Sequence, residues 1–230
     1  KNLPDVAVTP SKHFNVITYT GTDTDNVAIS TLIGTGVGFD PHFIWSKRKN
    51  TVTDHGLYDI LRGANKRLES NTSDAEFSDS NSVESFDTNG YTVSSDGTTN
   101  AGGTYVAWLW KANGSGSSNT NGDITSTVSA NTDAGFSIVS YTGNGVGYGS
   151  GGATVGHGLS VAPEFILVKR RDSGSGWVSY HPNQDGGTNG ERGYMHLNET
   201  QAYADYHEIW ADTKPTASVF KLGSAGNLNA

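Results

Sequence analysis

Cysteine is absent from the 230 residues of this chain, which excludes disulfide bonds, thiolate nucleophiles and zinc sites with cysteine ligands. Charged residues are scarce, at 17% against about 25% in an average globular protein. No apolar run approaches the roughly 18 residues that a membrane-spanning helix needs, so we expect no membrane association. Stability must therefore come from buried apolar side chains and from any association between subunits.

The charge balance is acidic: 15 Lys and Arg residues stand against 23 Asp and Glu residues, a net charge of −8. A surface of this sign repels phosphate backbones, so we expect no nucleic-acid partner. Glycine is abundant, at 30 residues, and the mean hydropathy of −0.46 reflects Ser, Thr, Asn and Gly more than charge. This composition favours short strands joined by turns, which predicts an all-β fold.

An internal repeat organises the chain. Three separated motifs of the first half recur in the second half at a single offset of 122 residues. They are VITYTG at 16–21 and IVSYTG at 138–143, PHFIWSKR at 41–48 and PEFILVKR at 163–170, and Tyr58 and Tyr180. One constant offset across three motifs indicates a tandem duplication.

Each copy has the pattern of a β-sandwich. The apolar runs 43–45, 105–110 and 165–168 are typical of buried strands, and Asn89-Gly90 and Asp96-Gly97 are strong turn signals. Short strands with glycine-rich turns predict two tandem β-sandwich units of jelly-roll type. The only segment with weak helical periodicity is 200–211.

The repeat and the local composition divide the chain into four parts. These are an N-terminal arm at 1–10, a first unit at 11–111, a flexible linker at 112–122 that is rich in Gly, Ser and Asn, and a second unit at 123–230. The second unit stops at Asn229-Ala230, the counterpart of Asn100-Ala101, without the strand that closes the first unit. Because an open core is unfavourable, we expect either that the native chain continues or that a neighbouring chain supplies the strand.

At these motifs the chain resembles a known family. Segments such as KHFNVITYTG, GFDPHFIWSKRK, GGTYVAWLWKANG and VGHGLSVAPEFILVKRR resemble repeats in structural proteins of marine tailed bacteriophages, also classed as concanavalin A-like lectin/glucanase domains. The resemblance extends from about Ser11 to Ala230. Two features depart from it: the missing last strand, and the divergent segment GYMHLNETQAYADYHEIWADT at 193–213, which weakens any equivalence of surface sites.

The resemblance implies a non-enzymatic virion structural protein, either a tail-fibre or appendage segment or a capsid decoration module, located in the virion. Its partners would be other virion proteins and further copies of itself, with trimers favoured by analogy. An alternative is a carbohydrate-binding adhesin that recognises a host glycan. A further alternative is a polysaccharide-degrading spike. No motif predicts a cofactor.

Aromatic residues crowd the second unit. Amphipathic rings in polar loops can stack on sugars or form subunit contacts, whereas in a core they fill space. The candidates for carbohydrate binding are Trp177, Tyr180, Tyr206 and Trp210. Core filling remains the alternative for Trp177 and Tyr180, because Tyr58 repeats the latter position.

Glycoside hydrolysis needs two carboxyl groups that face one groove. The single pair with suitable spacing is Glu208 and Asp212, which would share a face if the segment were a strand. The alternative is an exposed acidic strand or turn with Trp210 packed inward. Because no third carboxylate supports the pair and the first copy has no equivalent, we predict no catalytic residues.

Basic residues cluster directly after the equivalent apolar strands of the two copies. These interface candidates are Lys47, Arg48, Lys49, Lys169, Arg170 and Arg171. A third basic cluster comprises Arg62, Lys66 and Arg67. Such charges either protect strand ends against aggregation or form a docking patch for an acidic neighbour.

Two loops carry acids and amides that could ligate Ca²⁺, at 23–26 and 183–185, but neither matches a complete calcium-binding loop. Solvated turn residues are the alternative. The seven His residues lack the spacing of metal ligands, and His42, His157 and His181 are expected in turns or on the surface. We therefore predict no metal site.

Overall fold

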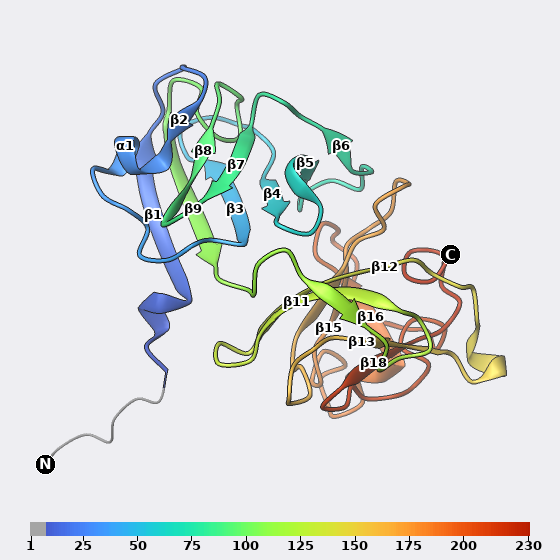
Figure 1. Ribbon diagram of the computed structural model, residues 1–230. Coiled ribbons are helices and arrows are strands. Elements are labelled where there is room, and N and C mark those ends of the chain that lie inside the picture. The colour runs from blue at the N-terminus through green and yellow to red at the C-terminus, as the bar shows by residue number, and fades with distance from the viewer. Residues whose placement is uncertain (1–7) are drawn as a thin grey trace, which may run out of the picture.

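Antiparallel strands are the main regular elements of the computed structural model, which describes residues 8–230 (Figure 1). The all-β sandwich class expected from composition is confirmed. Residues 1–7 of the predicted N-terminal arm lie outside the described residues, and the arm's last residue, Pro10, begins the short 3-10 helix η1 (Pro10–Lys12). No helix in the described part of the chain is long and apolar enough to cross a membrane.

The first unit contains two antiparallel sheets (Figure 1). The larger sheet has the order β1 (Phe14–Thr20), β9 (Thr104–Trp110), β3 (Phe43–Arg48), β4 (Gly56–Asp59), β5 (Gly63–Leu68) and β6 (Phe77–Ser78). The smaller sheet has the order β2 (Val27–Ala28), β8 (Gly90–Val93) and β7 (Val83–Asp87). One short helix, α1 (Ile29–Ile33), was not expected from the sequence and ends at Gly34, whose φ of 75° suits glycine.

Strict alternation of side chains builds the core of the first unit. In β9, Tyr105, Ala107 and Leu109 are buried while the residues between them are partly exposed, because successive side chains of a strand point to opposite faces. These three residues pack with Tyr91 and Val93 of the smaller sheet. Burial of their apolar surface is the main force that holds the two sheets together.

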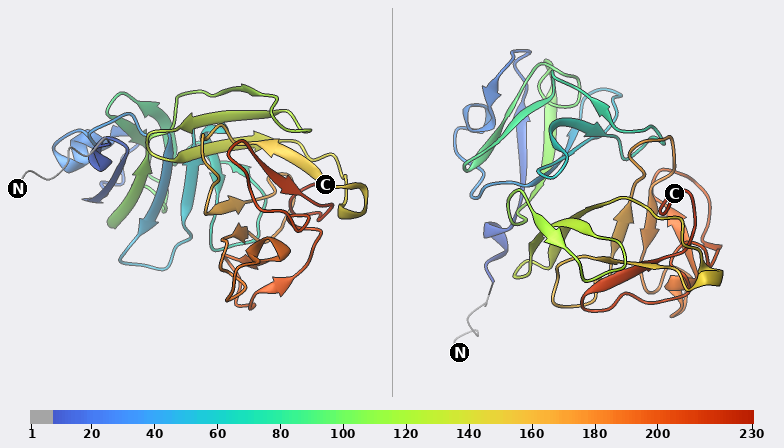
Figure 2. Two further views of the ribbon diagram at one scale, coloured as in Figure 1. Left: turned by 90° about the horizontal axis from the view of Figure 1, so that it is seen from below. Right: turned by 45° about the vertical axis from the view of Figure 1, so that its right-hand side comes forward.

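The second unit contains three sheets, each with fewer strands than the larger sheet of the first unit (Figure 2). The first has the order β10 (Ser117–Asn119), β11 (Ser126–Asn131) and β12 (Phe136–Tyr141). The second pairs β13 (Ala153–Gly156) with β18 (Val219–Leu222). The third has the order β14 (Ile166–Val168), β15 (Val178–Tyr180), β16 (Gly193–His196) and β17 (Ala204–Asp205). Two 3-10 helices are η2 (Tyr148–Ser150) and η3 (Gly190–Arg192).

The sequence repeat is also a repeat of strand pairing. Ile44 of β3 lies opposite Tyr58 of β4, and at the offset of 122 residues Ile166 of β14 lies opposite Tyr180 of β15. β13 pairs with β18 as β2 pairs with β8. The duplicated motifs therefore specify the same local sheet in both copies.

Two segments differ from their predictions. Residues 112–122 were expected to be a flexible linker, but β10 lies within them and pairs with β11. The many Ser and Asn residues concealed this strand, because its side chains are exposed or partly exposed and its order comes from backbone hydrogen bonds. The segment 200–211, with its weak helical pattern, forms β17 and turns and contains no helix.

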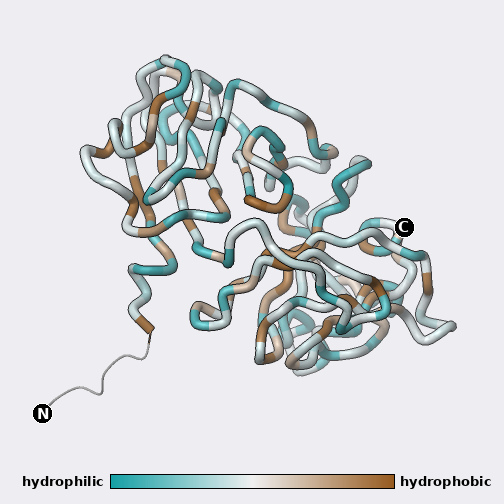
Figure 3. The backbone as a smooth tube through the Cα atoms, viewed as in Figure 1, coloured by the Kyte–Doolittle hydropathy of each residue, from teal (hydrophilic) through white to brown (hydrophobic). Residues whose placement is uncertain are grey.

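The two units pack against each other through an apolar cluster. Trp177 of the second unit is only 5% exposed and packs with Leu57 and Leu68 of the first unit. Its indole Nε1 donates a hydrogen bond of 2.8 Å to the backbone oxygen of Glu69. Brown apolar segments of both units meet at this junction in Figure 3, so the contact between the units is desolvated at its centre.

Candidate functional site

A cavity of about 1240 Å³ lies between the two units and is lined by residues of both. Its walls include residues 135–143, with all of β12, and residues 161–172, with all of β14. Trp177 and Arg62 line its side toward the junction, and Ala230 lines it as well. We call the space between β12 and β14 the open groove.

The open groove occupies the place that β9 fills in the first unit. There, β9 lies between β1 and β3 and pairs with both. The counterparts of β1 and β3 at the offset of 122 residues are β12 and β14. Within residues 8–230 no strand lies between these two, since β12 is the last strand of one sheet and β14 the first strand of another. Two sheet edges are therefore left without a partner strand.

Apolar side chains are more exposed around the open groove than at equivalent places in the first unit. Tyr19 of β1 is 6% exposed and Ile44 of β3 is fully buried, whereas Tyr141 and Ile166 are only partly buried. Phe165, the counterpart of Phe43, is 59% exposed. Clustered exposed apolar residues of this kind indicate a surface that binds something.

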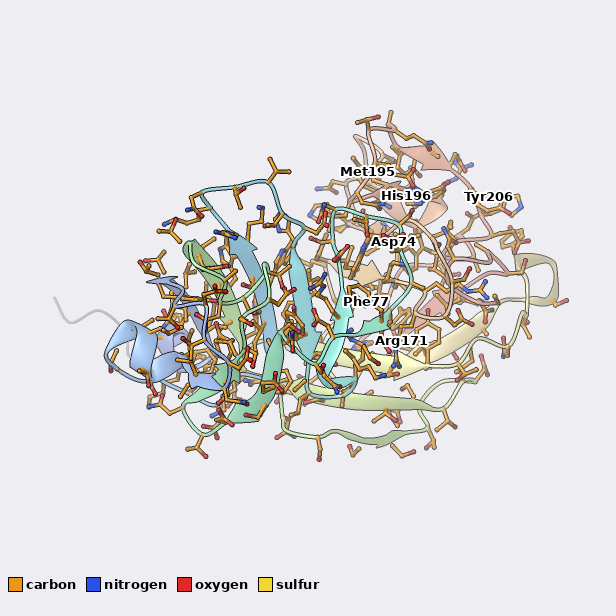
Figure 4. All side chains as sticks on the ribbon, turned by 90° about the horizontal axis from the view of Figure 1, so that it is seen from above. Asp74, Phe77, Arg171, Met195, His196 and Tyr206 are labelled. Carbon is orange, nitrogen blue, oxygen red and sulfur yellow. The ribbon has the colours of Figure 1, made fainter. Side chains whose placement is uncertain are left out.

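Charged residues connect the rim of the groove to the first unit. Arg171 forms two hydrogen bonds of 2.9 Å with the carboxylate of Glu76, and Figure 4 places Arg171 beside the strand that carries Phe77. Burial raises the pKa of Glu76, but the hydrogen bond from Arg171 and the charge of Arg62 outweigh this, so the pKa lies below its ordinary value. Glu76 is therefore held as a carboxylate at the junction.

The predicted basic patches serve contacts inside the chain. Lys47 donates to the backbone oxygen of Arg48 and to Thr53, and Lys169 donates to the backbone oxygens of Ser73 and Arg170. Arg171 finds its acidic neighbour, Glu76, in the first unit. The backbone amide of Lys49 donates to the backbone oxygen of Thr104 in β9. Contacts of these residues with other molecules stay a prediction.

The third basic cluster is largely internal. The side chain of Arg62 is 6% exposed and bonds to Asp59 and Glu76. The side chain of Arg67 is 13% exposed and forms ion pairs with the carboxylates of three acidic residues, which are Glu69, Asp79 and Asp96. Both guanidinium groups thus hold the first unit together.

Most of the predicted carbohydrate-binding rings are not accessible. Trp177, Tyr180 and Trp210 are only 5%, 2% and 2% exposed, so the prediction that their faces stack on sugars is wrong. Tyr180 and Trp210 instead pack against each other in the core, with ring centroids 5.7 Å apart. Tyr206 is 45% exposed, and Figure 4 shows it at the edge of the second unit, away from the junction.

Glu208 stabilises a loop. One of its carboxylate oxygens accepts hydrogen bonds from the amide and hydroxyl of Ser224 and from the amide of Tyr148. The bond from the amide of Ser224 is the main reason that the pKa of Glu208 lies below its ordinary value. Glu208 and Asp212 lie in turns, so they do not share the face of a strand. A general acid needs a raised pKa, and Glu208 has the opposite shift.

The two loops considered as calcium sites use their acids for hydrogen bonds inside the chain. Asp25 accepts hydrogen bonds from the amide and hydroxyl of Ser95, and Asp185 accepts them from the amides of Gly187 and Asn189. In the part of the chain that the structure describes, no three His, Cys, Asp or Glu side chains group as metal ligands would. His157, expected at the surface, is 3% exposed and its ring contacts the backbone oxygen of Thr216.

Sequence patterns alone did not single out the residues that shape the groove. Phe136 stacks on Trp110 of β9 with centroids 6.0 Å apart, and Phe165 faces the unfilled space. The signal was present in the repeat, because the two residues are the counterparts of Phe14 and Phe43, which both contact Trp110. The repeat thus marks these positions as neighbours of a closing strand.

Comparison with protein families gives one match, which covers residues 9–230 and so includes both units and the open groove. The chain belongs to the family DUF7483, a domain of unknown function. Neither the curated proteins nor the solved structures include a match to this chain. For this DUF7483 member, functional inference therefore rests on the groove and on the surface chemistry described above.

Proposed function

We propose that this DUF7483 chain is a non-enzymatic structural module of a tailed-phage virion, as a tail-fibre or appendage segment or a capsid decoration module. It acts through contacts with other polypeptides, including further copies of itself in a homo-oligomer. The observation that carries the proposal is the open groove, because two unpaired sheet edges beside exposed apolar side chains suit the binding of a polypeptide. The sequence resemblance to phage structural repeats supplies the virion context.

The state of the carboxylates supports a non-enzymatic role. Glu208 accepts three hydrogen bonds from Tyr148 and Ser224. Asp25 accepts a hydrogen bond from the amide of Ser95 in another loop, and Asp185 accepts one from the amide of Gly187 in its own turn. Arg62 and Arg171 neutralise Glu76. Each of these acids is engaged in hydrogen bonds or ion pairs that stabilise the fold, which argues against the polysaccharide-degrading alternative.

The composition of virus particles tests the proposal. We expect mass spectrometry of purified particles of the phage that carries this gene to recover peptides of the chain, in constant ratio to the major capsid protein. A non-structural phage protein from the same lysate serves as the control for carry-over. Recovery of the chain in the lysate but not in the particles would show that it is no virion protein.

A second candidate function, glycan recognition, is favoured by one surface feature. Tyr148 and Tyr206 are 43% and 45% exposed, and the ring of His207 lies between them, with centroids 4.8 Å and 6.1 Å away. Exposed aromatic rings beside a polar ring can stack on sugars while the hydroxyl and imidazole groups form hydrogen bonds.

Removal of both tyrosine rings tests glycan recognition. If a host glycan binds here, we expect Tyr148→Ala combined with Tyr206→Ala to weaken binding on a glycan array about fivefold, at roughly 1 kcal/mol for the pair of rings. Val52→Ala is the matched control, because Val52 is 99% exposed and lies in the other unit. Equal binding by the double variant and the control would exclude this surface.

A further inference from the structure

We propose that the open groove is an acceptor site for one β-strand with the side-chain pattern of β9, joined to the chain at Ala230. The strand would insert between β12 and β14, antiparallel to both, as β9 does between β1 and β3. This inference goes beyond the proposed function, because it rests on the two halves of the fold and holds whether or not the protein belongs to a virion.

The repeat specifies the register of the inserted strand. Trp110 of β9 lies opposite Phe14 on one side and Phe43 on the other. At the offset of 122 residues these neighbours become Phe136 and Phe165, so the last residue of the inserted strand lies between two phenylalanine rings. Phe165 is 59% exposed without it. Covering such rings removes apolar surface from water, which favours insertion.

The inserted strand must be apolar on its inward face. The residues of β9 that point into the core are Tyr105, Ala107 and Leu109, all fully buried. In the second unit the same face would cover Val139 and Tyr141, which pack against the core and remain partly exposed. An occupant with polar residues at these alternate positions would bury unpaired polar groups, which is unfavourable.

Ala230 lies where the inserted strand would begin. Asn100 accepts a hydrogen bond from the amide of Thr22, and its counterpart Asn229 accepts one from the amide of Asn144. A Cβ placed on Gly21 would lie 2.5 Å from the backbone oxygen of Ala101, and one placed on Gly143 would lie 2.5 Å from that of Ala230. The chain thus lies beside Gly143 at Ala230 as it lies beside Gly21 at Ala101, the residue from which the first unit continues toward β9.

The groove has backbone amides at the positions of those that bind the start of β9 in the first unit. The amides of Gly21 and Lys49 donate to Gly103 and Thr104, whereas their counterparts, the amides of Gly143 and Arg171, have no backbone acceptor within residues 8–230.

An arginine at the entrance of the groove has the position of Arg48. Arg48 bonds to Asn50 and to the backbone oxygen of Gly102, and it lies over the ring of Tyr105. Its counterpart Arg170 is oriented by Asp172 through a bond of 2.7 Å and donates through its Nη1 to the backbone oxygen of Gly226. The acceptor site therefore already holds a cation that can contact the backbone and the first aromatic ring of an entering strand.

A chain extended past Ala230 tests the proposal. The extension repeats the sequence of residues 102–111, GGTYVAWLWK, so that the copy of Gly102 follows Ala230 as Gly102 follows Ala101. We expect the melting temperature to rise by about 5 °C or more, and the amides of Val139, Tyr141 and Leu167 to gain protection in hydrogen exchange, because they have the positions of the β1 and β3 amides that face β9. The matched control carries Asp in place of the copies of Ala107 and Leu109, with the same length and backbone.

Two further measurements distinguish the alternatives. The same ten-residue peptide is added in trans to the unextended chain, where we expect a smaller rise in melting temperature because the peptide also loses translational freedom. In an Arg170→Ala background, we measure the rise in melting temperature from the unextended to the extended chain. We expect this rise to be smaller than the rise that the extension causes in the wild-type background.

The proposal is overturned if the extension gives no gain, or if the control extension with two Asp residues stabilises the chain equally. A peptide in trans that stabilises the chain as strongly as the extension would contradict attachment at Ala230 and assign the strand to a separate polypeptide. A gain that is confined to the apolar extension, with protection of β12 and β14, confirms the acceptor site.

Discussion

Replacing Trp177 with Ala is expected to lower the free energy of unfolding by about 3–5 kcal/mol, the range for a large aromatic residue removed from a packed core. Trp177 sits at the centre of the junction, in contact with Leu57 and Leu68. Its loss also removes the indole donor from the backbone oxygen of Glu69, which then keeps only the long bond of 3.4 Å from the amide of Thr72, and a weakened buried hydrogen bond adds to the cost. Because the junction joins the units, we further expect denaturation to separate into two transitions.

Two control variants make this prediction specific. Trp177→Phe keeps most of the apolar contact and removes only the donor, so its expected cost is about 1–3 kcal/mol. Tyr148→Ala removes an aromatic ring that is 43% exposed and should change stability by no more than about 0.5 kcal/mol. Urea denaturation followed by circular dichroism measures all three. A Trp177→Ala chain as stable as the wild type would show that the two units are held together elsewhere.

Arg62→Met is expected to cost about 3–5 kcal/mol near neutral pH, the range for breaking a buried ion pair by removing one partner. The side chain of Arg62 bonds to the carboxylates of Asp59 and Glu76, which are 7% and 11% exposed. It also donates to the backbone oxygens of Leu57 and Lys66. Methionine fills similar volume and satisfies none of these acceptors.

The cost of Arg62→Met should depend on pH in a definite direction. Burial raises the pKa of Glu76, but Arg171 and Arg62 together bring it below the ordinary value. A carboxyl group whose pKa is lower in the folded state adds stability above its unfolded pKa of about 4.3, and this stability is lost as the pH falls through the lower folded value. Without Arg62 the contribution of ionised Glu76 to stability is smaller. The difference in free energy of unfolding between Arg62→Met and the wild type should therefore shrink below about pH 4.

Lys66→Met is the matched control for the charge change. Lys66 lies on β5, which begins directly after Arg62, and its ammonium group donates to the hydroxyl of Ser78 near the surface. We expect a change within about 0.5 kcal/mol at every pH. Chemical denaturation of the three chains between pH 3 and 7 measures these differences. A cost for Arg62→Met that stays constant over this range would show that the lost ion pair with Glu76 is not its cause.

Most of the correct predictions about the fold came from the sequence repeat. Its constant offset located the equivalent strands, and the pairing of Ile166 with Tyr180 reproduces that of Ile44 with Tyr58. Composition was sufficient for the all-β class, because few residues favour helices and many favour turns. The segment 112–122 was misjudged, since a strand such as β10 that is held by backbone bonds leaves little pattern in its side chains.

The candidate site was harder to predict, because an aromatic ring in a sequence carries no sign of its exposure. Trp177 is the counterpart of His55. The backbone amide of Trp177 donates to the side chain of Asn198, and the backbone amide of His55 donates to the side chain of the equivalent Asn71. The first unit has a partly exposed histidine at this position, whereas the second has a tryptophan that closes the junction. Only the packing of one unit on the other explains the difference.

By itself, the sequence determined the all-β class and the motifs that recur at one offset of 122 residues. The tertiary structure decided which charges face each other, which rings are buried, and that β12 and β14 border an open groove beside Ala230. The physical reason is that strand propensity and side-chain alternation are local properties along the chain. Burial and ion pairing depend on residues far apart in sequence, such as Glu76 and Arg171.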